Sequence, residues 1–445
     1  MVGKGVLARC ACAAAAAAIA IGPSHAQSRS CGSPTLLVRN VTQWTSSGPR
    51  FGRDVFVRDG RIAAIEPEGQ PRSGNVATID GTGHTLLPGF VDAHLHLTIP
   101  GGLPPGDRPA HELTRIAGQQ LLRSGVTSGR LHLATIEDAV RLRTQSADPC
   151  ATLPRLQVGG PGLSGGVDRD FGSFQGVKSI EDARSKIDRF RAAGIEWVAI
   201  HDAEKIAPAV REALRAAVRE AGLRIMASGN SPDEIAAALS LRPDTLDYFD
   251  RSASERYADD LLAAIRAQKD LVLVPTPGVP TRTIAYRDNA SLVEAPSNFE
   301  FLSPGDRDFV LSTARNDLGG AEPARSARVL QSLPAKFAQL RHLGLTMAVG
   351  SDAGSPLHFP AGAIWWELEA WRSLGATHRE ALTAATEHGA RVLRTADTGR
   401  LTVGARADFI LYRGDVEQGP FELARVLEVV KDGVRFVAGG RWVAN

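Results

Sequence analysis

LLPGFVDAHLH, residues 86–96, is a short apolar run that ends in two histidines one residue apart. Pro88 interrupts the run, which is otherwise typical of a buried β-strand. Because side chains on a strand alternate, His94 and His96 point the same way, about 7 Å apart along the backbone. Neutral imidazoles are common ligands of zinc and similar ions. The stretch therefore predicts half of a metal site at the point where a strand meets a loop.

The first 26 residues have the pattern of a secretory signal peptide. Lys4 and Arg9 supply a basic segment, an Ala-rich apolar stretch runs from Cys10 to Gly22, and Ser24-His25-Ala26 is typical of a cleavage site. The apolar stretch is too short to favour a membrane span, and no later run reaches about 18 apolar residues. We therefore predict an exported protein, periplasmic or secreted, without membrane association after cleavage. A retained N-terminal anchor is the alternative.

Charge and cysteine content narrow the partners. The chain carries 51 Lys and Arg against 49 Asp and Glu, and loss of the two basic signal residues would bring its net charge from +2 to zero. Such a balance gives no electrostatic footprint for nucleic acid, so we expect a small-molecule substrate; a homo-oligomer is left open. Of the four cysteines, only Cys31 and Cys150 would remain after cleavage. In an oxidising compartment they either form a disulfide or stay free.

The two ends of the chain share a β-strand pattern. Residues 27–86 and 399–445 contain short apolar runs separated by turns, and Asp59-Gly60 between two such runs is a strong hairpin signal. We predict that these two segments form one small composite β-sandwich. Residues 87–398 would then form the main domain between them.

Strand-like and helical runs alternate through this main domain. After the strand before His94, strand-like runs occupy residues 125–131, 155–159, 195–200, 224–227, 245–249, 271–275 and 345–350, with helical periodicity at residues 180–193, 207–221 and 231–241. Eight β–α steps predict an α/β fold, a closed (β/α)₈ TIM-like barrel. An open doubly wound sheet is the alternative, although no G-x-G-x-x-G follows the first strand. Residues 277–325 are long for a connection and predict a loop that partly covers the barrel mouth.

Two motifs, PGFVDAHLH at residues 88–96 and GSDAG at residues 350–354, point to a known family. On them the chain resembles the metal-dependent amidohydrolase superfamily, in its imidazolonepropionase-like and prolidase-like branch. The likeness extends over nearly all of the chain after the signal segment. Its specific motifs are PGFVDAHLH at residues 88–96 and GSDAG at residues 350–354. Supporting motifs are GVTS at 125–128, GGPGLS at 159–164, ALTAAT at 381–386, and the stretch from Gly399-Arg400-Leu401 to Ala407-Asp408.

The resemblance implies a ligand set at the barrel mouth. Members of the superfamily hold one or two divalent metals through an HxH pair on strand 1, a carboxylated lysine or glutamate on strand 4, histidines on strands 5 and 6, and an aspartate on strand 8. By this likeness His94, His96 and Asp352 look like metal ligands. Asp352 also looks like the catalytic base that takes a proton from the metal's water. A divalent ion lowers the pKa of that water and polarises the scissile carbonyl.

The sequence departs from the family pattern at three ligands. Ala199 occupies the position of the strand-4 lysine, and no histidine occurs between His201 and His342, so strands 5 and 6 lack theirs. Tyr248 falls where the family places its second single histidine. An ordinary two-metal centre is therefore not encoded. We expect one divalent metal, zinc, on His94, His96 and Asp352. His201 is either a fourth ligand or a histidine that lies at the surface or behind the ligands.

Several other residues carry predicted roles. Tyr248, His358 and Asn230 are candidate substrate contacts because they follow predicted strands or the Asp352 motif. Arg130 and Arg155 are expected in structural ion pairs, with contact to an acidic substrate as the alternative. His132 is expected to be a satisfied structural histidine, with a place in the pocket as the alternative.

Two functions fit this pattern. The first is an exported hydrolase of amide, cyclic amide or dipeptide-like C–N bonds other than peptide bonds, which uses a metal-activated water. The second is a catalytically silent protein of the same fold that binds a small molecule or a partner. Retention of His94, His96 and Asp352 together favours the hydrolase, whereas the three missing ligands favour the silent protein.

Overall fold

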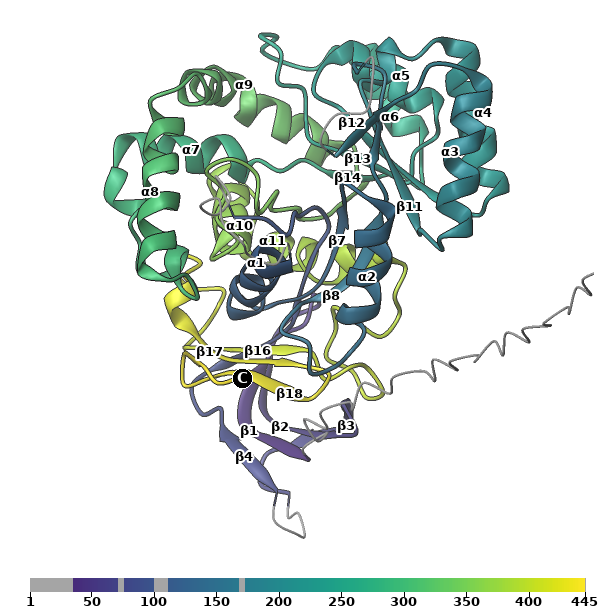
Figure 1. Cartoon of the computed structure of the whole chain (residues 1–445). Coiled ribbons are helices and arrows are strands. Elements are labelled where there is room, and N and C mark those ends of the chain that lie inside the picture. Colours follow the sequence, from purple (N-terminus) through teal and green to yellow (C-terminus); the bar gives the residue numbers. More distant parts are fainter. Residues whose placement is uncertain (1–34, 71–75, 100–110, 168–172, 445) are drawn as a thin grey trace, which may run out of the picture.

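The computed structural model describes residues 35–70, 76–99, 111–167 and 173–444, which are organised by two sheets (Figure 1). The predicted signal segment, residues 1–26, lies outside the described residues, as does Cys31. Among the described residues, no helix has both the length and the apolar character needed to cross a membrane.

A parallel sheet forms the barrel. Its strands follow the order β6 (Phe90–Asp92), β7 (Val126–His132), β8 (Arg155–Gly159), β11 (Trp197–His201), β12 (Arg224–Ser228), β13 (Thr245–Asp247), β14 (Val272–Val274) and β15 (Thr346–Met347), with β9 (Gly162–Ser164) and β10 (Phe174–Gly176) attached beside β11. The sheet closes where the Ala93 N–H donates to the Val349 carbonyl at 2.9 Å and Leu95 forms a parallel bridge with Ala353. The predicted (β/α)₈ barrel is confirmed, because every strand-like run of the sequence contributes to it in chain order.

Helices surround this sheet. They are α1 (His111–Arg123), α2 (Ile136–Ser146), α3 (Ile180–Ala192), α4 (Pro208–Glu220), α5 (Pro232–Ser240), α6 (Asp259–Ala267), α10 (Ala363–Ser373), α11 (His378–Ala384) and α12 (Glu387–Leu393), with short 3₁₀ turns η1 (Ala203–Lys205) and η4 (Leu423–Arg425). Helix α4 is typical, because its buried residues Val210, Leu214 and Val218 recur every fourth position and form one apolar stripe. The predicted helices at 180–193, 207–221 and 231–241 are confirmed to within one residue at each end.

The expectation of a long loop at residues 277–325 is wrong. This segment folds into α7 (Gly278–Asp288), the 3₁₀ turns η2 (Ala290–Leu292) and η3 (Pro296–Phe299), α8 (Pro304–Leu318) and the start of α9 (Glu322–His342). Helix α7 buries polar as well as apolar side chains, among them Arg282 and Thr283, so it lacks the apolar stripe by which a helix is recognised. These helices lie together on one side of the barrel (Figure 1).

The second sheet unites both ends of the chain. In the order of the sheet its strands are β19 (Arg441–Trp442), β18 (Val434–Ala438), β17 (Val426–Lys431), β16 (Phe409–Tyr412), β5 (Thr85–Pro88), β1 (Leu36–Gln43), β2 (Arg50–Arg58) and β3 (Arg61–Pro67), and β4 (Ala77–Asp80) pairs with β1. A shared core joins Val38 and Val55 from the N-terminal strands to Phe409 from the C-terminal ones. The predicted Asp59-Gly60 hairpin joins β2 to β3, with φ of 52° and 71° at its two central residues, as a type I′ turn requires. We call this unit the β-domain.

The stretch at residues 86–96 is not one strand, as its apolar pattern suggested. Strand β5 belongs to the β-domain and β6 to the barrel, so the chain crosses from one sheet to the other at Gly89. A Cβ atom at Gly89 would lie 2.3 Å from the Thr127 hydroxyl oxygen, which explains why only glycine fits at this crossing. Apolar periodicity cannot reveal the break, because both strands are fully buried.

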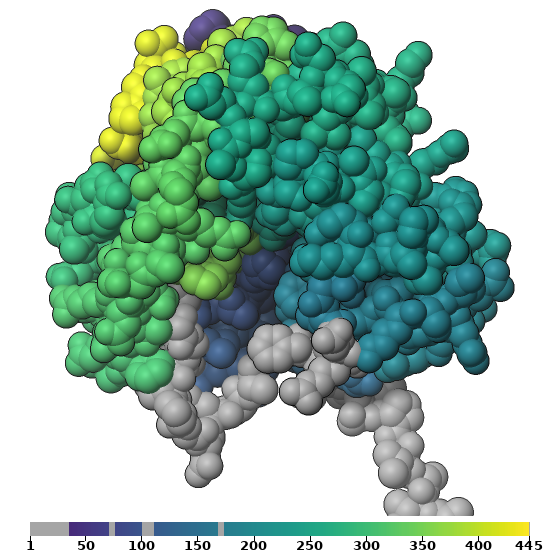
Figure 2. Space-filling model, turned by 90° about the horizontal axis from the view of Figure 1, so that it is seen from above, coloured from purple at the N-terminus to yellow at the C-terminus, as the bar shows by residue number. Residues whose placement is uncertain are grey.

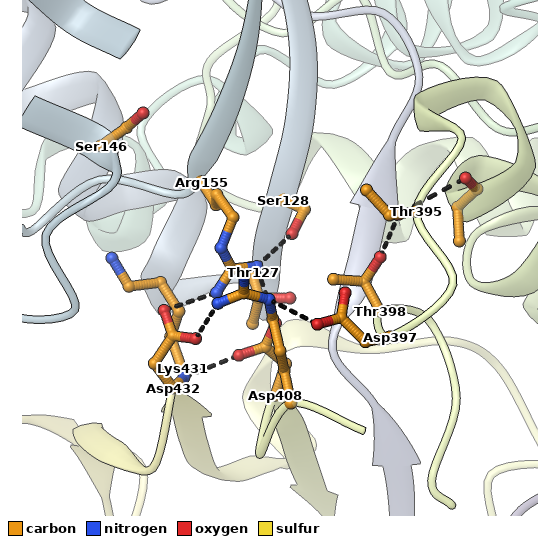
Figure 3. Close-up of polar contacts among 12 residues, drawn as sticks. Thr127, Ser128, Ser146, Arg155, Thr395, Asp397, Thr398, Asp408, Lys431 and Asp432 are labelled. Carbon is orange, nitrogen blue, oxygen red and sulfur yellow. Dashed lines mark hydrogen bonds and ion pairs between the residues drawn. The ribbon is translucent and has the colours of Figure 1, made fainter. Parts of the chain in front are cut away.

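An ion network with buried carboxylates attaches the β-domain to the barrel: Asp408 and Asp432 are at most 9% exposed, whereas Arg155 is 19% exposed (Figure 3). Arg155, at the start of β8, donates to Asp408 at 3.0 Å and to Asp432 at 2.5 Å, and also to the Ser128 hydroxyl at 3.0 Å. Arg406 donates to the other oxygen of Asp432 at 2.8 Å. The structural pairing predicted for Arg155 is confirmed. Removing one partner of such a network leaves buried charges without compensation.

We expect Arg155→Met to lower the free energy of unfolding by roughly 3 kcal/mol, because Asp408 and Asp432 would lose a buried cation. The measurement is urea denaturation followed by circular dichroism. Arg61→Met is the matched control, since Arg61 forms an ion pair with Asp397 that is largely exposed and should cost less than about 1 kcal/mol. Equal losses in the two variants would contradict the role given to Arg155.

Candidate metal centre

The candidate site residues meet at the carboxyl ends of the barrel strands. His94 and His96 follow β6, His132 and His201 are the last residues of β7 and β11, and the remaining candidates Asn230, Tyr248 and Asp352 follow β12, β13 and β15. In a parallel barrel these ends all lie on one face. The topology therefore brings together side chains from six different strands.

A buried charge network fixes His94. Its Nδ1 lies 2.7 Å from Oδ2 of Asp247, which also accepts from Arg130 Nη2 at 2.6 Å. All three side chains are at most 4% exposed. Arg130 further donates to the Ala93 carbonyl and the Thr245 hydroxyl, each at 2.8 Å. The structural pairing predicted for Arg130 is confirmed, and it holds the strand-1 histidine through a shared carboxylate.

The charges around the site keep the carboxylates of Asp247 and Asp352 ionised. Burial alone would raise the pKa of Asp247, but Arg130 and His94 hold it below its usual value. Burial would likewise lower the pKa of His94, yet Asp247 and then Asp352 raise it overall. For Asp352, burial is outweighed by the hydrogen bond with His96 and the charges of His94 and His96, so its pKa is lowered.

Three side chains form a compact cluster of metal-ligating types. Ligand atoms of His94, His96 and Asp352 all lie within 4.8 Å of one another, and no other such group of three occurs in the described part of the chain. The Asp352 Oδ1 atom lies 3.1 Å from His96 Nε2 and 3.6 Å from His94 Nε2. Tyr248 adds its hydroxyl 3.0 Å from His94 Nε2. The three residues that the sequence predicts as ligands therefore lie together, and their binding of a metal stays a prediction.

The backbone around the cluster is held in uncommon conformations. Tyr248 and Asp352 have φ of 71° and 52°, in the left-handed region that bulky residues rarely adopt. The Asp352 N–H donates to the His94 carbonyl at 2.9 Å, and the Asp92 carboxylate accepts from the Ser351 amide at 2.9 Å. Gly350 allows this close approach, because a Cβ there would lie 2.7 Å from the His94 Cβ. The ends of the first and last barrel strands are therefore locked together.

A cavity of about 840 Å³ opens above the cluster. The view onto this face of the barrel shows a central hollow, with blue atoms from an early part of the barrel segment visible inside it (Figure 2). Its wall includes His96 and Asp352 from the cluster, and His132, His201, Asn230, Tyr248 and Arg251 around it. The volume is in the range of small-molecule sites.

His132 and His201 extend the imidazole array beyond the cluster. The ring of His132 lies 5.3 Å from that of His96 and 5.6 Å from that of His201, measured between centroids. Within the described residues, His132 Nδ1 and His201 Nε2 are buried without a hydrogen-bond partner. The expectation that His132 is a satisfied structural histidine is therefore wrong; it faces the cavity instead. His201 lies outside the group of three, and its ligand role stays a prediction.

The predicted substrate contacts occupy different positions. Tyr248 and Asn230 line the cavity, whereas His358 is 2% exposed and is not part of the wall. Asn230 is held by Glu234, whose Oε2 accepts hydrogen bonds from the backbone N–H of Asn230 at 2.8 Å and from its side-chain Nδ2 at 3.2 Å. Burial raises the pKa of Tyr248 well above its usual value, so its hydroxyl remains a hydrogen-bond donor.

Sequence reasoning missed the residues that orient this site. Asp247 and Glu234 carry no motif, and Arg130 was given only a generic structural pair. One signal was available: Ser128, Arg130 and His132 alternate along one strand, so the arginine points to the same face of that strand as the histidine. A buried arginine requires a carboxylate partner, and β13, which is not adjacent to β7 in the sheet, ends in Asp247.

Comparison with known proteins places the chain in a family. The model described as "Amidohydrolase family" matches residues 85–436. The chain belongs to the amidohydrolase family. An imidazolonepropionase from Mycolicibacterium smegmatis is 26% identical over 396 residues, covering 85% of this chain and 90% of that one. The predicted superfamily, in its imidazolonepropionase-like and prolidase-like branch, is thereby confirmed, and with it a hydrolase type that acts on C–N bonds.

Solved structures show the same fold. A prolidase crystallised with N-methylphosphonate-L-proline superposes with a TM-score of 0.70 at 18% identity, covering 91% of this chain and 99% of that chain. Phenylurea hydrolase B gives a TM-score of 0.66 at 19% identity, covering 90% and 96%.

Strand β11, the fourth of the barrel, shows what replaces one of the three ligands that the resemblance implies and the sequence lacks. Ala199, at the position matched to the lysine, is 1% exposed and packs with Trp197 and Met226. Trp197 in turn contacts Arg130, whose Cζ lies 4.7 Å from the ring centroid. Ala199 thus belongs to an apolar cluster that is covered by a cationic group.

One cysteine prediction falls partly outside the described residues. Cys150 is disulfide-bonded. Its predicted partner Cys31 lies outside the described residues, so the pairing itself stays a prediction.

We expect the stability of the metal-free protein to fall as pH drops below about 6.5. Burial, followed by Arg282, lowers the pKa of His358 to about 3, and the unfolded chain would bind this proton near 6.5. Because the folded pKa is depressed, the stabilisation is complete above 6.5 and declines towards pH 3. His358→Gln should remove roughly 3 kcal/mol of the loss between pH 6.5 and 4. Chemical denaturation at each pH measures it. The exposed His342→Gln should leave the slope unchanged, and an unchanged slope in His358→Gln would contradict the assignment.

Proposed function

We propose that this amidohydrolase hydrolyses C–N bonds with one divalent metal, zinc, held by His94, His96 and Asp352. The observation that carries this proposal is the convergence of the three ligand atoms within 4.8 Å at the floor of a small-molecule cavity. The candidate substrates are amides, cyclic amides and dipeptide-like compounds. The branch to which the chain belongs supports this bond class.

The residues present fit a zinc ion. Two imidazoles and one carboxylate form a donor set that catalytic zinc sites use, with a fourth position left for water or substrate. Hard cations such as Mg²⁺ prefer all-oxygen sites. The hydrogen bond of His94 Nδ1 to Asp247 leaves Nε2 directed at the cluster, which is the orientation that a metal-ligating histidine takes from its outer partner.

Each residue has a distinct task in this proposal. A bound divalent cation would supply an activated water and polarise the substrate carbonyl. Asp352 is ionised at neutral pH, so it is ready to receive the proton that the water loses. Tyr248 keeps its proton and donates a hydrogen bond to the substrate oxygen. Asn230, fixed by Glu234, binds the substrate from the cavity wall.

The zinc content of the purified protein distinguishes the hydrolase from the catalytically silent alternative. We expect the purified protein, after zinc loading and desalting, to hold about one zinc per chain by elemental analysis. His94→Ala should lose that zinc, because one of its three proposed ligands is removed. His342→Ala serves as the control, since His342 is exposed and remote from the cluster. If the protein binds no metal and added zinc leaves its thermal stability unchanged, the hydrolase proposal is contradicted and the silent protein is favoured.

We also propose that the hydrolase is exported, on the signal pattern of residues 1–26. Expression of the full chain in a bacterial host with its native N-terminus should give a mature protein that begins after Ala26. N-terminal sequencing of the periplasmic fraction checks this. A protein that retains Met1 and stays in the cytoplasm would contradict export while leaving the catalytic proposal untouched.

A further inference from the structure

We propose that the end of the barrel opposite the metal cluster holds a second ligand site, a basic cavity that binds a diphosphate group. This cavity has a volume of about 820 Å³, and Thr245 and Val272, the first residues of β13 and β14, lie in its wall. The cluster of His94, His96 and Asp352 lies at the carboxyl ends of the barrel strands, so the two sites face opposite directions. The second site is therefore independent of the proposed hydrolase.

Cationic side chains outnumber acidic ones in the wall of the basic cavity. Two acidic residues, Asp244 and Asp270, stand against five cationic ones, which are Arg219, Arg242, Lys269, Arg391 and Arg394. The cations lie at or just after the C-terminal ends of the helices α4, α5, α6 and α12. A helix C-terminus attracts cations with roughly half an elementary charge, so four such ends leave part of the excess of three positive charges unneutralised.

The carboxylate of Asp244 is already fully engaged. Its Oδ2 accepts hydrogen bonds from Arg219 Nη1 at 3.0 Å and from the backbone N–H of Ile225 at 2.8 Å. Its Oδ1 accepts from Arg394 Nη2 at 2.6 Å. One carboxylate thus serves two arginines, and it has no oxygen left for the other cations of the cavity.

Three of the five cations have no ion-pair partner in the described part of the chain: Arg242, Lys269 and Arg391. Arg391 donates only to a neutral group, the Thr346 hydroxyl, at 2.7 Å. All three residues are exposed, so an incoming anion can reach them without breaking an ion pair. Arginine and lysine are the side chains that bind phosphate oxygens in proteins. A diphosphate carries about three negative charges near neutral pH, which matches the excess.

The excess of positive charge continues into the barrel. Arg224, the first residue of β12, donates to the Val392 carbonyl in the cavity wall at 2.8 Å and to Gln157 Oε1 at 2.6 Å. No described residue forms an ion pair with it. Burial, followed by the charges of Arg130 and Arg394, lowers the pKa of Arg224. An anion in the basic cavity offsets this repulsion between cations, which the described chain leaves uncompensated.

The basic cavity is larger than a diphosphate group needs. Its wall also includes the apolar side chains of Pro243, Leu271 and Val392, against which an organic group attached to the diphosphate can pack. Free diphosphate and an organic diphosphate share the chemistry that the cations recognise. The choice of probe distinguishes these two sources.

Calorimetric titration of the purified, zinc-treated protein with inorganic diphosphate tests the site. We expect diphosphate to bind at least roughly tenfold more tightly than orthophosphate, and to bind more weakly as NaCl is raised, because salt screens the attraction. The double variant Arg242→Gln, Lys269→Gln should lose roughly tenfold or more in affinity, since two unpaired cations are removed. Both residues are exposed and lack ion pairs, so circular dichroism should show an unchanged fold. Lys269→Gln alone should give an intermediate loss.

Two controls locate the bound diphosphate. The double variant Arg184→Gln, Arg189→Gln removes the same charge from the exposed face of α3 and should leave the affinity unchanged. Removal of zinc should also leave it unchanged, because the metal cluster lies at the other end of the barrel. The result therefore stands apart from any outcome for the hydrolase.

ADP distinguishes the two sources of the diphosphate group. Binding of ADP more tightly than inorganic diphosphate supports an organic diphosphate as the ligand, whereas equal or weaker binding supports free diphosphate. The proposal is overturned if neither probe binds, if the variant Arg242→Gln, Lys269→Gln keeps the full affinity, or if binding disappears with the zinc. Binding of phosphatidylglycerol vesicles without binding of diphosphate also overturns it and indicates a membrane-facing basic surface instead.

Discussion

The buried network of Arg130, Asp247 and His94 is the constraint on which the site depends. It joins three barrel strands through a carboxylate that is completely inaccessible to solvent. Without Arg130, burial would favour protonation of Asp247, and a neutral Asp247 would no longer fix the ring of His94. Because each charge compensates another, the three side chains can occupy the apolar barrel interior only together. The orientation of His94 Nε2 is therefore set by the fold before any metal arrives.

The cavity around this network is lined by neutral imidazoles. Burial lowers the pKa of His201 to about 4 and that of His132 well below its usual value. Neutral rings beside His96 avoid placing positive charges next to a divalent cation, and they offer lone pairs or N–H groups to a polar substrate. His201 lies two residues beyond Ala199 on the same strand, and Tyr248 follows β13. Both line the cavity, so polar side chains remain close to the positions where the resemblance implies the missing ligands.

The β-domain contributes rigidity and not chemistry. Its strand β5 leads directly into β6 of the barrel sheet, so the position of β5 helps to fix the histidine pair that follows β6. Arg155 then ties β8 to Asp408 and Asp432. A displacement of the β-domain would move the segment that carries His94 and His96, which explains why a β unit remote from the cavity is locked to the barrel by buried charges.

The sequence by itself determined the barrel, the β-domain built from both chain ends, and the cluster of His94, His96 and Asp352. Strand alternation, hydrophobic periodicity and family-like motifs are local signals, so they can be recognised from the sequence alone. Only the tertiary structure decided which polar groups share a buried space: the carboxylate between Arg130 and His94, and the position of His132 in the cavity wall. Those depend on side chains far apart in the chain, whose burial and pairing exist only once the strands have closed. Helix α7 escaped prediction for the same reason, since it is buried on more than one face and so carries no apolar stripe.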